Sequence, residues 1–133
     1  MKFTKIWGVV MAATLTLALA TGCGKDDDNE ITINIISPTN DQVVSNKSAV
    51  LIHVEFDAEV ENHNVEVLIH NDDDVNDVAF TWDEHDHDKK IILMETIDLS
   101  SYPSGTKFHM EVEACKSHDC KDKVFKDIEF SIP

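Results

Sequence analysis

An alternation of apolar and polar residues recurs from residue 31 to the C-terminus and constrains the fold most. Ile31, Ile33 and Ile35 alternate with polar residues, and Val50–Phe56 and Phe108–Ala114 repeat the pattern. A period of two places every second side chain on the same face of an extended chain, so each segment predicts a strand with one buried face. No part of this region keeps the 3.6-residue period of a helix.

Turn signals separate these segments at short intervals. Ser37–Asn40 contains a proline, Asn71–Asn76 is acidic, and Asp83–Asp88 reads as a polar loop. Gln42–Ser45 is expected to be a short continuation of the first strand. Ile91–Ile97 predicts a strand whose buried face the sequence leaves open, because its first four residues are all apolar. Short strands with regular turns are typical of a β-sandwich. We therefore expect an all-β sandwich of about seven strands over residues 31–133.

The N-terminus has the pattern of a bacterial secretory signal. Lys2 and Lys5 precede an uncharged apolar run over residues 6–20, which is too short to span a bilayer as a stable helix. The stretch Leu19–Cys23 resembles a lipobox, in which the cysteine after the cleavage point is acylated, although alanine stands at position 20 where leucine is commoner. We expect a lipoprotein signal peptide over residues 1–22 and a lipidated Cys23. The alternative is an ordinary signal peptide that leaves this cysteine as a free thiol.

An acidic segment follows the expected lipid anchor. Residues 23–30 comprise Cys23 and the sequence Gly-Lys-Asp-Asp-Asp-Asn-Glu, which by composition is a flexible charged tether. This segment resembles the acidic export signal of surface lipoproteins in the Bacteroidota. The resemblance implies an outer-membrane protein displayed on the cell surface, whereas a plain linker would be compatible with retention in the periplasm.

Charge excludes some classes of partner. The chain has a formal net charge of −15. It contains no arginine, and after removal of residues 1–22 nine lysines remain against 26 acidic residues, a charge of −17. Nucleic acids and anionic membrane surfaces are therefore excluded as ligands, since both need cationic contacts. A cationic partner or a metal ion fits this charge, and a merely solvated surface is the simpler interpretation.

The sequence offers no enzyme motif. Only Gly24 and Gly105 follow the signal segment, so a glycine-rich phosphate loop cannot form. Neither a G-x-S-x-G turn nor an H-E-x-x-H helix is present. We therefore expect a non-enzymatic protein.

Two cysteines remain after lipidation. Cys115 and Cys120 bracket a four-residue hairpin tip that contains His118. In an oxidising compartment such a pair favours a disulfide. The alternative is a metal site, because thiolate and imidazole are both zinc ligands.

Histidines suggest a second type of metal site. His85 and His87 point the same way in an extended chain and suit Zn²⁺ or Cu²⁺, and His70 and His109, on strands expected to be neighbours, are candidate further ligands. The alternative is a solvated polar loop. Asn71–Asp74 with Asp77 could hold Ca²⁺, but the EF-hand spacing and its glycine are missing, so a plain acidic turn is favoured.

The strand pattern is similar to that of bacterial immunoglobulin-like domains. The part from Tyr102–Gly105 into Phe108–Ala114 resembles the penultimate strand of such domains. More narrowly, the chain resembles a family of Bacteroidota surface lipoproteins with a histidine-bearing immunoglobulin-like domain of unknown function, on the basis of Glu66–Asn71, His85–His87 and Lys107–His109. The resemblance implies an immunoglobulin-like or fibronectin-III-like sandwich. It also implies a surface-exposed, lipid-anchored binding or structural module for an unknown protein or glycan. The alternative function is a lipoprotein that binds Zn²⁺ or Cu²⁺.

Overall fold

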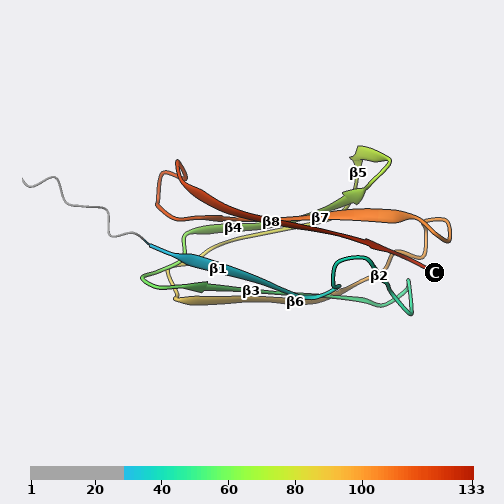
Figure 1. Ribbon diagram of the computed structural model, residues 1–133, viewed down its shortest axis with the longest axis horizontal. Helices are drawn as coiled ribbons and strands as arrows, with labels where there is room; N and C mark the ends of the chain where they lie inside the picture. The colour runs from blue at the N-terminus through green and yellow to red at the C-terminus, as the bar shows by residue number, and fades with distance from the viewer. Residues whose placement is uncertain (1–28) are drawn as a thin grey trace, which may run out of the picture.

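Eight strands form within residues 29–133, the part of the chain that the computed structural model describes (Figure 1). They form two sheets, one with the order β1-β3-β6 and one with the order β2-β8-β7-β4-β5. The expectation of an all-β sandwich is thus confirmed. The strands are β1 (Ile31–Ser37), β2 (Gln42–Val43), β3 (Val50–Ala58), β4 (Asn64–Asn71), β5 (Asp74–His85), β6 (Lys90–Ile97), β7 (Lys107–Cys115) and β8 (Lys123–Ser131).

The signal peptide (residues 1–22), Cys23 and most of the tether lie outside the described residues. Within residues 29–133 no helix has the length and apolar character needed to cross a bilayer.

The core lies between the two sheets and is made by the apolar positions of the alternating pattern. Phe56 on β3, Leu93 on β6 and Phe108 on β7 are at most 2% exposed. The rings of Phe108 and Phe130 stack with centroids 5.4 Å apart. Burial of apolar surface of this kind is the main stabilising contribution in a domain of this size.

Three details differ from the sequence-based expectation or complete it. Gln42–Val43 does not continue β1 but pairs in parallel with β8 in the other sheet. β5 runs from Asp74 to His85 and so includes residues expected in the flanking turn and loop, because its pairing with β4 continues to the Asn64–His85 pair. An edge strand at the margin of a sheet can stay paired while its side chains face solvent, so polarity alone did not mark its end. In β6 the buried face is that of Ile91 and Leu93.

Antiparallel strands place alternate connections at the same end of the molecule. The β3–β4, β5–β6 and β7–β8 connections all lie at the end where β1 begins (Figure 1). The β4–β5 hairpin lies at the opposite end. In this view the end where β1 begins is on the left and the β4–β5 hairpin is on the right. This arrangement brings three polar loops and the start of the described chain together.

Candidate metal centre

Four histidines meet at the end of the sandwich where β1 begins, and we call them the histidine cluster. His63 precedes β4, His85 ends β5, His87 lies in the β5–β6 loop, and His118 lies in the β7–β8 loop. The ligand atoms of His63, His87 and His118 lie within 4.8 Å of one another. The ring of His85 lies 5.1 Å from that of His87 and 5.4 Å from that of His118, measured between centroids. Three separate connections therefore each supply at least one imidazole.

The spacing suits one metal ion after a small adjustment. Zn–N bonds of about 2.0–2.1 Å in a tetrahedral site place the ligand nitrogens about 3.3 Å apart. The nitrogens of His63, His87 and His118 would thus close in by up to about 1.5 Å, which side-chain rotation can supply. His87 and His118 are exposed, so they are free to make that rotation.

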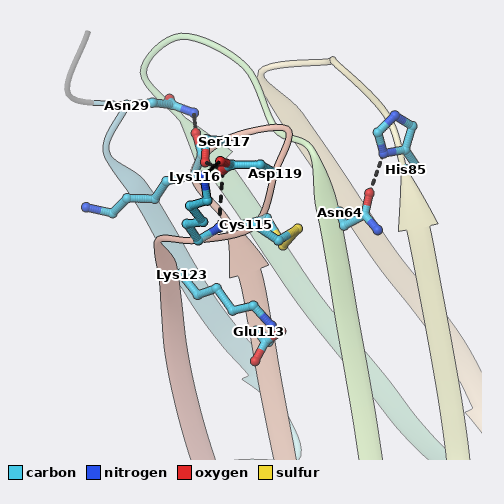
Figure 2. Close-up of a disulfide and its surroundings, with 11 residues drawn as sticks. Asn29, Asn64, His85, Glu113, Cys115, Lys116, Ser117, Asp119 and Lys123 are labelled. Atoms are coloured by element: carbon cyan, nitrogen blue, oxygen red, sulfur yellow. Dashed lines mark hydrogen bonds and ion pairs between the residues drawn. A yellow bond between two sulfur atoms is a disulfide. The ribbon is translucent and has the colours of Figure 1, made fainter. Parts of the chain in front are cut away.

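Hydrogen bonds orient the fourth imidazole. Nδ1 of His85 is hydrogen-bonded to the side-chain oxygen of Asn64 on the neighbouring strand (Figure 2). Because that amide oxygen only accepts, this contact favours the tautomer with the proton on Nδ1, which leaves the lone pair of Nε2 for a metal ion. Metal-binding histidines usually donate their other ring nitrogen to such an acceptor, which fixes the tautomer and the orientation of the ring.

Asparagine side chains fasten the loops to each other. The amide of Asn29 donates to the carbonyl oxygen of Glu61 at 2.6 Å and to that of Lys116 at 3.1 Å, which joins the β3–β4 and β7–β8 loops. The fully buried Asn62 donates from its side chain to the carbonyl oxygen of Asp88 at 2.8 Å, which joins the β3–β4 and β5–β6 loops. The three loops are thus held in place before any ion binds.

A disulfide closes the loop that carries His118. Cys115 and Cys120 are joined, with Cα atoms 4.8 Å apart, and the bridge spans the base of the loop (Figure 2). The expected disulfide is therefore present, and the alternative in which the two thiolates bind a metal with His118 does not describe this structure. The histidine of that alternative nevertheless joins the cluster.

The surroundings of the cluster favour neutral imidazole and a bound cation. His63 is 8% exposed, and burial lowers its pKa below 6.5, although the carboxylate of Glu61 opposes this effect. Its Nδ1 is buried without a hydrogen-bond partner. Imidazole binds metal only when unprotonated, so a lowered pKa preserves the ligand form at neutral pH.

Carboxylates add negative charge beside the cluster. Glu61 places its two oxygens 3.8 Å from Nε2 of His63 and 3.3 Å from Nδ1 of His87. Hydrogen bonds from Lys121 and Ser117 lower the pKa of Asp119 to about 2, but the ammonium group of Lys121, 2.8 Å away, offsets the charge of this carboxylate. The carboxylate of Glu61, at its distances, is therefore the negative group that attracts a divalent cation here.

The structure divides the four histidines expected from the sequence into two groups. His85 and His87 belong to the histidine cluster, but His70 and His109 do not. His70 lies six positions along β4 from Asn64, the partner of His85, which at about 3.3 Å per residue is about 20 Å away. A single site of these four residues is therefore not assembled.

Sequence reasoning missed His63 as a ligand, although a signal for it was present. His63, His87 and His118 lie in alternate connections between expected strands, and such connections share one end of an antiparallel sandwich. A histidine in each of them would have indicated the cluster without any knowledge of contacts.

The acidic hairpin does not gather its carboxylates around one point. Asp77 accepts hydrogen bonds from the amide of Asn71 at 3.1 Å and from the hydroxyl of Tyr102 at 3.0 Å. Asp72 instead lies with His109 and Glu129. The residues considered for Ca²⁺ therefore have separate roles.

Comparison with known proteins found no protein-family model that matches the chain and no similar curated protein.

Proposed function

We propose that this chain is a lipid-anchored surface protein whose sandwich domain binds one divalent transition-metal ion, Zn²⁺ or Cu²⁺, at the histidine cluster. The observation that carries the proposal is the convergence of His63, His87 and His118 to within 4.8 Å, with the ring of His85 beside them. Imidazole suits both ions, in a tetrahedral arrangement for Zn²⁺ and a square-planar one for Cu²⁺.

The ligand set favours binding over catalysis. Four imidazoles fill the coordination positions of tetrahedral Zn²⁺, whereas catalytic zinc keeps one position open for water. Three of the four ligands, His85, His87 and His118, are exposed, so an ion could enter and leave without unfolding of the domain. These features support a role in capture or retention of metal.

The expected anchor places the cluster on the membrane side. Asn29 contacts the loops of the cluster, and only five residues separate it from Cys23. At about 3.4 Å per residue the lipidated cysteine would lie within about 20 Å of this end of the domain. Cys23→Ala is expected to release the protein from membranes, and continued retention would refute the anchor.

Isothermal titration of the purified, chelator-treated protein tests the metal site. One equivalent of Zn²⁺ or Cu²⁺ is expected to bind tightly near neutral pH, and His87→Ala with His118→Ala is expected to weaken binding at least 100-fold. Both side chains are exposed, so the double variant should remain folded. His53→Ala is the matched control, because His53 contacts Glu55 on β3 and belongs to neither group of histidines. Unchanged affinity in the double variant would overturn the proposal.

A further inference from the structure

The outer face of the five-stranded sheet carries a second group of metal-ligating side chains, at the end opposite the histidine cluster. Ligand atoms of His109, Asp72 and Glu129 lie within 4.8 Å of one another. They come from β7, the β4–β5 turn and β8, and His109 and Glu129 are direct cross-strand partners. We call these three residues the β7 site.

More carboxylates surround His109. Its Nε2 lies 3.3 Å from an oxygen of Asp127 and 3.9 Å from one of Glu111. The four carboxylates of this region are those of Asp72, Glu111, Asp127 and Glu129. Among residues 29–133 no lysine forms an ion pair with any of them, although Lys107 lines a pocket with Glu129. The region therefore has more negative than positive side chains, which favours a cation.

His70 packs against the candidate ligand His109. It is 6% exposed, and its ring stacks on that of His109 with centroids 5.4 Å apart. Its Nδ1 lies 3.1 Å from the carbonyl oxygen of Asn71, and its Nε2 lies 3.4 Å from an oxygen of Glu111.

The strand register places further negative charge beside this group. Glu111 is directly opposite Asp127 across the β7–β8 pair. Like charges at directly opposed positions destabilise a sheet. A cation bound nearby would reduce this repulsion.

We propose that the β7 site binds a second divalent cation through His109, Asp72 and Glu129. Its mixed imidazole and carboxylate ligands differ from the all-imidazole histidine cluster. Carboxylate oxygens suit harder ions, so this site accepts Mn²⁺ as well as Zn²⁺, whereas the all-imidazole cluster discriminates against Mn²⁺. This inference does not depend on the function proposed above.

Paramagnetic broadening by Mn²⁺ in amide NMR spectra tests the inference in the variant His87→Ala with His118→Ala, which lacks the first site. Substoichiometric Mn²⁺ is expected to broaden amide signals near residues 72, 109 and 129, and to leave those near residue 63 sharp. In the same background Asp72→Asn with Glu129→Gln is expected to raise the Mn²⁺ dissociation constant at least tenfold. Both residues are exposed, and the spectrum itself reports whether the fold is kept.

A matched control separates a site from general attraction to an acidic surface. Glu66→Gln with Glu113→Gln removes two charges from a directly opposed pair elsewhere on the same face. This variant is expected to change the dissociation constant less than twofold. If it weakens Mn²⁺ binding as much as the first variant, or if broadening is spread over all exposed carboxylates, the β7 site does not exist.

Discussion

Removal of the Cys115–Cys120 disulfide should affect stability and metal binding by separable amounts. The bridge closes a loop with a sequence separation of five residues. In the chain-entropy model a loop of this length restricts the unfolded chain by roughly 2 kcal/mol at 25 °C. For a domain of about 100 residues, roughly 5 °C per kcal/mol gives a fall in melting temperature of about 10 °C for Cys115→Ala with Cys120→Ala.

The effect on metal affinity comes from His118 inside the loop. Without the bridge the loop samples other conformations. The Zn²⁺ affinity is then multiplied by the fraction of time in which His118 remains at the cluster. A fraction of one tenth would raise the dissociation constant for Zn²⁺ about tenfold. The two effects have different origins, because one acts on the unfolded chain and the other on the native loop.

Calorimetric melting of the metal-free protein and Zn²⁺ titration of the folded protein measure the two effects separately. A non-thiol reductant should reproduce both in the unmodified protein and should change nothing in the double variant, which is the control. A melting temperature within 2 °C of the unmodified protein would refute the entropy argument. A large fall in melting temperature with unchanged Zn²⁺ affinity would show that the bridge does not position His118.

Three further outcomes follow from burial and hydrogen bonding. Burial lowers the pKa of His63 below 6.5, so as pH falls the unfolded chain binds a proton at this residue at a higher pH than the native protein does. The free energy of unfolding should therefore fall as pH drops below about 6.5. His63→Gln should flatten this part of the profile in urea denaturation of the metal-free protein. Asn62→Ala removes the donor to the carbonyl oxygen of Asp88 and should cost about 1–3 kcal/mol in urea denaturation while weakening Zn²⁺ binding. Leu93→Ala, in the core, should cost about 2–5 kcal/mol by the same assay with Zn²⁺ affinity unchanged, and a changed affinity would contradict the separation of core and site.

The sequence predicted the sandwich well because its signal is local. In β3 and β7 each strand buries every second residue, and this alternation can be read without knowledge of the partner strand. β6 was ambiguous because Ile92 and Met94 are apolar yet exposed, so its two faces look alike in the sequence. The extent of β5 was missed because pairing with β4, rather than apolar side chains, maintains its polar ends.

The candidate site was harder to predict because it depends on contacts between distant residues. The spacing of His85 and His87 predicted two ligands that do come together. Their expected partner His109 faces outward on β7 at the other end of the sheet, and the actual partners His63 and His118 come from loops 24 and 31 residues away from His87. The alternation of strand connections determines which loops share an end, and the sequence-based prediction did not apply that rule to the histidines.

The placement of the two groups of histidines follows from the architecture. A sandwich core filled by apolar side chains leaves only loop ends and outer faces for coordinating groups, and the two proposed sites lie one at each kind of place. They are separated by about 20 Å along β4, which exceeds the screening length of about 8 Å at physiological ionic strength. Ions at the two places should therefore interact weakly. One equivalent of Zn²⁺, which fills the histidine cluster and leaves no excess to compete at the β7 site, should change the Mn²⁺ dissociation constant of the β7 site less than twofold. A larger change would mean that the sheet transmits strain between its ends, since direct charge repulsion at that distance is too weak to cause it.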